Sequence, residues 1–363
     1  MNGYEGMLTA LKRDGEPDFL PIWELIINEP VMRALFGKVS LFDFVEKMDL
    51  DGICVAEDIQ LQRAETKPRV AIIDDFGIKW SYSGVVFQPS EGPIKRVEDL
   101  NAYEMPDPNS EKKYASLKLV IQRFKEKRAI VFLSHDSFEH SAYLVGGIAN
   151  LMRWYVLYPE AVKGLADRIS EYKQTTLRIA SKMGADILLT GDDYAFRDRS
   201  MMSPKQFKEF VLPYLERAVT IAKSNKLPFI KHTDGNLWDI IDMIVGAGID
   251  GLHPLEPVAG MDIGRVKKLY GNRIAVIGNI DCTYILPHGT EAEVVDAVKE
   301  TIAKASPGGG HIISSSNSIH PGVKPENYRT MVKAARKYGK YPIDKQLVEE
   351  NKKRSYVSRL MPR

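Results

Sequence analysis

The feature that most constrains the fold of this chain is a series of eight short, β-prone apolar segments, each followed by a longer stretch of helical periodicity. Strands that alternate with helices pair in parallel, and eight such strands close into a (β/α)8 barrel. We therefore predict an α/β fold of the TIM-barrel type. A doubly wound open sheet is the alternative, but no G-x-G-x-x-G motif follows the first segment. The predicted strands are residues 21–25, 52–58, 129–136, 185–193, 228–235, 251–257, 273–281 and 311–319.

The helices between these segments have clear start and stop signals. Apolar residues recur at helical spacing over residues 159–183, and Gly184 follows as a stop. Capping boxes mark the starts of two further helices. The two boxes are Ser203 with Gln206 and Thr290 with Glu293. The last regular helix is expected between Pro325 and Gly339.

One connection is too long for a simple crossover. About 70 residues separate the second and third segments, and residues 69–100 among them are rich in β-branched and aromatic residues. We expect a β-hairpin insertion there, over the barrel mouth. Its aromatic residues Trp80, Tyr82 and Phe87 form a small core of their own, or one of them closes over an apolar ligand. The predicted domain is thus a single barrel over residues 1–342, and residues 343–363 are a tail that is either solvated or clasps a second subunit of a homodimer.

The composition narrows the classes of partner. Fifty Lys and Arg residues against 48 Asp and Glu residues give a formal charge of +2, so no strong field favours nucleic acid or an anionic membrane. A small molecule is the expected ligand. The two cysteines, Cys54 and Cys282, are too few for a disulfide framework or a sulfur-rich metal site, which fits a reducing cytoplasm. No apolar run has the length of a secretory signal or a membrane span.

Polar residues gather at the C-terminal ends of the predicted strands, where a (β/α)8 barrel builds its active site. His232 and Asp234 are two apart on one strand and therefore face the same way. Imidazole nitrogen and carboxylate oxygen bind Zn²⁺, and Glu256 on the next strand is a third candidate ligand that leaves a position open for substrate. The competing interpretation is that His232 and Asp234 bond each other or a helix N-terminus.

The other strand-end residues each have a functional and a structural interpretation. Asp192 and Asp193 are adjacent and point opposite ways, so at most one of them faces the site. His135 and His140 are assigned to packing or capping. The residues predicted to anchor substrate or move a proton are Asp58, Asp192 and Asp281, and for Asp58 and Asp192 capping is the alternative. The residues predicted to bind substrate are Glu24, Tyr143, Tyr194, Asn279 and Asn317.

Four segments carry a resemblance that covers most of the chain. They are "GDDYAFRDRSMMSPKQFKEFVLPYLERAV" (191–219), "KHTDGNLWDIIDMIVGAGIDGLHPLEP" (231–257), "VIGNID" (276–281) and "SSSNSIHPGVKPENY" (314–328). These segments resemble the uroporphyrinogen decarboxylase superfamily, which includes cobalamin-dependent methyltransferases. The resemblance implies an enzyme of one of these two kinds.

The resemblance to the decarboxylases departs at the residues that grip substrate. Those enzymes carry an arginine-rich segment near the first strand, whereas residues 21–37 contain Arg33 as their one basic residue before Lys38. A polycarboxylate substrate would lack its counter-charges. Asp58 matches the pyrrole-binding aspartate of the decarboxylases, but their histidine on the last strand is replaced by Asn317. Decarboxylation by Asp58 without metal remains the alternative activity.

The methyltransferases that act on coenzyme M resemble this chain at a zinc motif of His-x-Cys and a later Cys. The corresponding positions are His232, Asp234 and Asn317. Oxygen and nitrogen ligands leave zinc a stronger Lewis acid, suited to a leaving ether oxygen. The resemblance therefore implies transfer of a methyl group from a small methylated donor, such as a methoxylated aromatic, to the cobalt of a corrinoid on a partner protein. A broad barrel mouth is expected, and a non-catalytic corrinoid- or tetrapyrrole-binding barrel is the third possibility.

Overall fold

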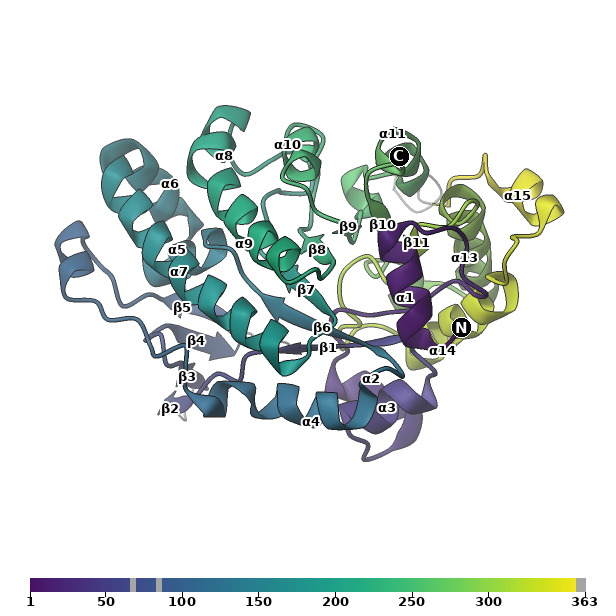
Figure 1. Ribbon diagram of the computed structural model, residues 1–363, viewed down its shortest axis with the longest axis horizontal. Coiled ribbons are helices and arrows are strands. Elements are labelled where there is room, and N and C mark those ends of the chain that lie inside the picture. Colours follow the sequence, from purple (N-terminus) through teal and green to yellow (C-terminus); the bar gives the residue numbers. More distant parts are fainter. Residues whose placement is uncertain (66–69, 83–86, 357–363) are drawn as a thin grey trace.

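The computed structural model describes residues 1–65, 70–82 and 87–356. Its centre is a parallel sheet with the strand order β1-β6-β7-β8-β9-β10-β11 (Figure 1). Each of these strands lies inside a predicted one and is shorter, because the polar ends of the predicted segments lie in loops. The strands are β1 (Gly52–Ala56), β6 (Ala129–Ser134), β7 (Ile187–Thr190), β8 (Phe229–His232), β9 (Gly251–His253), β10 (Ala275–Ile277) and β11 (His311–Ile312).

The first predicted strand, residues 21–25, is reduced to a single parallel bridge between Ile22 and Ile313. Ile313 N donates to Pro21 O at 2.9 Å on one side, and Asp51 N donates to Ile22 O at 2.8 Å on the other. The segment therefore joins the end of the sheet to the start of β1. The predicted (β/α)8 barrel is confirmed. Residues 21–25 take the place of one of its eight strands, although only these few hydrogen bonds join them to their neighbours.

Helices surround the sheet, and the sequence signals for them are confirmed. Residues 159–183 form one helix, and the two capping boxes start α8 and α13. No helix in the described part of the chain is long and apolar enough to cross a membrane. The helices are α1 (Gly3–Lys12), α2 (Glu29–Phe36), α3 (Leu41–Lys47), α4 (Ala115–Phe124), α5 (Phe138–Leu144), α6 (Ile148–Leu157), α7 (Pro159–Met183), α8 (Pro204–Phe210), α9 (Leu212–Ser224), α10 (Ile241–Gly246), α11 (Ile263–Tyr270), α12 (Ile285–His288), α13 (Glu291–Ala305), α14 (Pro325–Tyr338) and α15 (Lys345–Asn351).

The inside of the barrel is a packed apolar core that helix α1 closes at the N-terminal end of the strands. Alternate strand residues such as Ile187, Leu189 and Ile230 point into this core and pack with Met7 and Leu11 of α1. Glycine at the start of β9 leaves room for α1, since a Cβ on residue 251 would lie 2.9 Å from the end of the Leu11 side chain, which would have to shift. The intervening strand residues face the outer helices and belong to a second, larger core.

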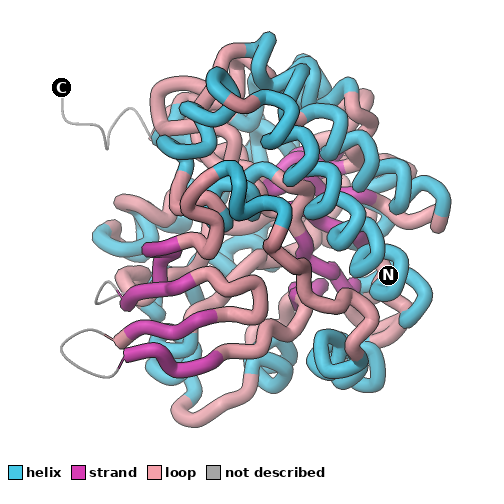
Figure 2. Tube along the Cα trace, turned by 90° about the vertical axis from the view of Figure 1, so that its left-hand side faces the viewer, coloured by secondary structure: helices cyan, strands magenta, loops and turns pink. Residues whose placement is uncertain are grey.

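The long connection after β1 is a four-stranded antiparallel sheet, larger than the predicted hairpin (Figure 2). It begins at Gln62, and positions 69 and 83–86 of the predicted insertion lie outside the described residues. Tyr82 and Phe87 contact each other, with ring centroids 5.3 Å apart, but Trp80 packs on Tyr143 of α5 at 5.6 Å. The strands are β2 (Gln62–Glu65), β3 (Ala71–Ile73), β4 (Lys79–Tyr82) and β5 (Phe87–Glu91).

The C-terminal segment packs against its own barrel, an arrangement that the sequence analysis did not consider. Helix α15 packs on α13. Beyond α15, the Tyr356 hydroxyl donates to Asn279 O at 2.9 Å, and Tyr356 N donates to Glu300 at 2.8 Å. Residues 357–363 of the predicted tail lie outside the described residues.

Candidate metal centre at the barrel mouth

Three potential metal ligands meet at the carboxyl ends of β7 and β8. Ile230 belongs to the inner core, so His232, two residues later, also points inward. The same alternation from Leu189 carries Asp193 inward and Asp192 outward. His232 Nε2 lies 3.5 Å from Asp193 Oδ1 and 3.8 Å from Asp234 Oδ1. One ligand atom from each of the three residues lies within 4.8 Å of the others.

The spacing of these atoms fits a bound cation better than direct hydrogen bonds. Distances of 3.5 and 3.8 Å exceed those of normal N–H···O bonds. They are close to the edge, about 3.4 Å, of a tetrahedron of ligands around zinc at bond lengths of about 2.1 Å. Burial lowers the pKa of His232 to about 4, so its imidazole is neutral at pH 7, as a metal ligand must be.

Asp234 is a further sign of a cation site, because its carboxylate is buried among other carboxylates. Its Oδ1 atom is buried and has no hydrogen-bond partner among the described residues. Burial raises the pKa of Asp234 well above its usual range, and the neighbouring Asp193 and Glu256 raise it further. A divalent cation between Asp193, His232 and Asp234 would neutralise this crowding. These residues therefore fit a zinc-type ion.

The sequence analysis missed Asp193 and named Glu256 as the third ligand. Glu256 is in neither group of potential ligands among the described residues. Its Oε2 accepts a hydrogen bond from Gly235 N at 3.1 Å, and its pKa is raised by burial. Its role as a ligand stays a prediction. Strand alternation left open which of Asp192 and Asp193 faces inward, and the inward-facing Leu189, an even number of residues before Asp193, decides it.

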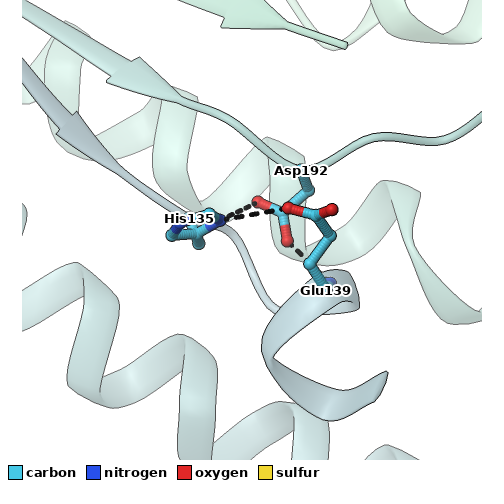
Figure 3. A group of neighbouring side chains, drawn as sticks. All are labelled: His135, Glu139 and Asp192. Carbon is cyan, nitrogen blue, oxygen red and sulfur yellow. Dashed lines mark hydrogen bonds and ion pairs between the residues drawn. The ribbon is translucent and has the colours of Figure 1, made fainter. Parts of the chain in front are cut away.

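A second group of potential ligands lies beside the first, at the ends of β6 and β7 (Figure 3). His135 Nδ1 lies 3.6 Å from Glu139 Oε2 and 3.5 Å from Asp192 Oδ2. Asp192 is fully buried and accepts backbone bonds from Asp136 N at 2.7 Å and Glu139 N at 2.9 Å. Burial acts to raise the pKa of Asp192, but His135, Lys231 and these bonds outweigh it and hold the pKa below its usual range. Its carboxylate thus anchors the loop into α5, and a catalytic role for it stays a prediction.

Behind the strands, a buried ion pair supports the same loop. Lys231 Nζ lies 3.2 Å from Asp136 Oδ2 and 3.9 Å from the centre of the Tyr194 ring. The Tyr194 hydroxyl donates to Asp136. Tyr194, predicted to bind substrate, is fully buried in the outer core cluster. The structure therefore places it behind the site rather than in it.

Asp58 and Asp281, the other residues predicted to move a proton, accept backbone hydrogen bonds at the starts of helices. Asp58 accepts from Ser116 N at 2.8 Å at the beginning of α4. Asp281 Oδ1 accepts from Tyr284 N at 2.6 Å and Ile285 N at 2.9 Å at the beginning of α12, while its buried Oδ2 has no partner among the described residues. The capping alternative describes Asp58, the structure shows the same arrangement at Asp281, and the catalytic roles of both stay predictions.

The remaining predicted substrate-binding residues divide between the site and its support. Asn317 donates to Asp234, and the Tyr143 side chain bonds Glu139, so both adjoin the acidic mouth. Asn279 is buried and donates to Leu255 O at 2.8 Å. Glu24 accepts from Ser315 Oγ at 2.6 Å and Ser315 N at 3.0 Å, and burial raises its pKa to about 8.

A model of the family described as uroporphyrinogen decarboxylase (URO-D) matches residues 70–338. The chain belongs to the uroporphyrinogen decarboxylase family. Its similarity to a uroporphyrinogen decarboxylase of Thioalkalivibrio sulfidiphilus is 24% identity over 370 residues, covering 92% of this chain and 97% of that protein. A methylated-thiol–coenzyme M methyltransferase of Methanosarcina mazei is 26% identical over 192 residues, covering 53% of this chain and 49% of that one.

The solved structure of a methyltransferase from Methanosarcina mazei shares the fold. It superposes with a TM-score of 0.71 at 17% identity and covers 93% of this chain and 99% of that chain. The resemblance drawn from the sequence is therefore confirmed. The uroporphyrinogen decarboxylase family joins decarboxylases and methyltransferases, so the chain is related to enzymes of both kinds.

The mouth of this family member is strongly acidic. Burial raises the pKa values of Glu139, Asp234 and Glu256, and the neighbouring carboxylate of Asp193 raises all three further. Arg33, in the region where the decarboxylases carry an arginine-rich segment, is exposed and pairs with Glu29 of its own helix. Such a mouth attracts cations and repels polycarboxylates.

Proposed function

We propose that this protein is a corrinoid-dependent methyltransferase. It moves a methyl group from a small methylated donor, such as a methoxylated aromatic, to the cobalt of a corrinoid held by a partner protein. The observation that carries this proposal is the inward-facing group of Asp193, His232 and Asp234, whose spacing and unpaired Asp234 oxygen fit a zinc-type ion. Zinc held there would act as a Lewis acid on the heteroatom to which the methyl group is bonded, and so make that heteroatom a better leaving group.

The residues around this group have distinct tasks in the proposed reaction. Asn317 orients Asp234 through its side-chain amide. Glu139 lies close enough to Asp234 and Asp193 to interact with both, and its raised pKa, caused by burial and by the adjacent carboxylates, keeps a proton available at the mouth. We assign the delivery of a proton to the departing heteroatom to Glu139 in preference to Asp58, Asp192 and Asp281, which hold backbone N–H groups.

Decarboxylation is the second candidate, favoured by the names of many relatives. A porphyrinogen with several carboxylates would meet the carboxyl groups of the mouth, and in place of the arginine-rich segment of the decarboxylases it would find Arg33, which is exposed and paired with Glu29. Asp58, which would act in that reaction, already accepts hydrogen bonds from the backbone and side chain of Ser116. The missing arginine-rich segment and the hydrogen bonds already held by Asp58 therefore support methyl transfer over decarboxylation.

One experiment separates the two candidates. Zinc-loaded protein is mixed with a reduced corrinoid protein and a panel of methoxylated aromatics and other methylated donors, and the absorption spectrum is followed for methyl-Co(III). Methyl-Co(III) formation that is lost on chelation of the metal is the expected result. Release of CO₂ from a porphyrinogen by the metal-free protein, with no methyl-Co(III) from any donor, would contradict the proposal.

A further inference from the structure

His253 lies beside His232 inside the barrel, on the neighbouring strand β9. The two residues are direct partners in the parallel pairing of β8 with β9. Their ring centroids are 4.9 Å apart and their Nδ1 atoms are 2.7 Å apart. Two ring nitrogens at this distance share one proton, because two lone pairs or two N–H groups would repel each other.

The position of the shared proton decides whether His232 can bind a cation. Its other nitrogen, Nε2, faces Asp193 and Asp234. Nε2 presents a lone pair to a metal only when the proton of the neutral ring is on Nδ1. That Nδ1–H group then needs an acceptor inside the barrel, and His253 Nδ1 is in place to accept it.

The His253 imidazole has one hydrogen-bond contact among the described residues, and that contact is with His232. The residue is fully buried and packs against Trp23, with ring centroids 5.3 Å apart. Its Nε2 atom has no hydrogen-bond partner among the described residues. The contact with His232 is therefore the interaction that distinguishes the His253 imidazole from an apolar side chain of similar size.

We propose that His253 is a positioning residue, which accepts the Nδ1–H of His232 and so fixes His232 in the tautomer and orientation that make Nε2 a metal ligand. This inference rests on the metal site of the proposed function. Hydrogen-bond partners of this kind commonly change metal affinity by about 10- to 100-fold.

The test measures zinc affinity by competition with a chromophoric chelator in three variants. His253→Leu removes the acceptor, and we expect its zinc affinity to fall by about 10- to 100-fold. His253→Asn keeps an acceptor, since the amide oxygen takes the place of Nδ1, and we expect affinity close to that of the wild type. His140→Leu is the matched control, because His140 is also buried with no partner for either ring nitrogen among the described residues, and its variant should bind zinc normally.

Each contrary outcome identifies what has failed. Wild-type zinc affinity in His253→Leu would overturn the positioning role and leave the metal site standing. Absence of zinc binding by the wild-type protein would overturn both. Nitrogen-15 NMR of zinc-loaded wild-type protein gives a reading that needs no variant. A proton on His232 Nδ1 with none on His253 Nδ1 is expected, and a protonated His253 Nδ1 would overturn the inference.

Discussion

Both faces of the strands at the barrel mouth carry aspartates, but the partners of these aspartates differ between the faces. On the outer face, Asp192 accepts two backbone N–H groups and Asp136 is paired with Lys231. On the inner face, Asp234 has a buried oxygen without a partner among the described residues, and other carboxylates surround it. The outer carboxylates have their counter-charges built in, whereas the inner ones leave room for a cation. Asp193 Oδ1 also accepts a bond from Asp234 N at 2.9 Å, so the feature that marks the inner face is the crowded carboxylate of Asp234 with its unpartnered oxygen.

The strongest test of this contrast removes the imidazole of the inner face. In His232→Ala we expect zinc affinity to fall by on the order of 1000-fold, since one of three protein ligands is lost and binding energy is concentrated in few bonds. Methyl transfer should disappear with it. Metal content after dialysis gives the measurement, and His288→Ala, at an exposed histidine of α12, is the control. Retention of zinc by His232→Ala would exclude His232 from the site.

The second test compares one aspartate from each face. Asp192→Asn loses an acceptor for buried N–H groups, so we expect its free energy of unfolding to fall by about 2 to 4 kcal/mol. Asp234→Asn removes a crowded buried charge, so the metal-free protein should be as stable as the wild type or about 1 kcal/mol more stable. Its zinc affinity should nevertheless fall by about 10- to 100-fold. Urea unfolding and chelator competition measure the two effects, and equal destabilisation by both variants would remove the contrast.

Glu24 sharpens the comparison, because it is hydrogen-bonded and yet has a pKa raised to about 8 by burial. The native state therefore binds a proton more tightly than the unfolded state, whose carboxyl has the ordinary pKa of 4.5. This contribution to stability is complete below pH 4.5 and is lost as the pH rises to about 8. In metal-free protein, Glu24→Gln should remove a decrease of a few kcal/mol over that range. If Glu24→Gln and the wild type lost stability equally as the pH rises, the pKa of Glu24 would not be raised in the folded protein, and the prediction would be wrong.

The smallest expected effect is at Asp58. If its carboxylate only caps α4 through Ser116, Asp58→Ala should cost about 1 kcal/mol of stability and leave zinc affinity unchanged. Asp58→Asn should cost less, because the amide oxygen can accept the same backbone bond. A large loss of turnover in Asp58→Asn without a loss of stability would instead support the catalytic role predicted from the sequence.

Elements whose signals are local could be read from the sequence. The helix over residues 159–183 and the capping boxes at Ser203 and Thr290 depend on residues within one or two turns, and the structure reproduces them. The eight apolar segments sufficed for the barrel. The shortening of the first segment to the Ile22 bridge could not be read, because its hydrogen bonds depend on β11 and on the start of β1.

For the site, the sequence predicts which residues of a single strand lie together, but not which residues of different strands meet. His232 and Asp234 are brought together by period two along a single segment, and the structure places them side by side. Asp193 required the choice of which of two adjacent carboxylates faces inward, which depends on where Leu189 packs. The contact of His253 with His232 depends on the register between β8 and β9, which no local pattern encodes.

Helix α1 seals one end of the cylinder with Met7 and Leu11. In the proposed reaction, a small methyl donor and a bulky corrinoid carrier would therefore both approach from the opposite rim, one after the other. Under the proposed chemistry, the demethylated product would obstruct the arrival of the carrier for as long as it stayed. The order of arrival and departure, more than the strength of any one contact, would then govern the turnover of a barrel closed at its base.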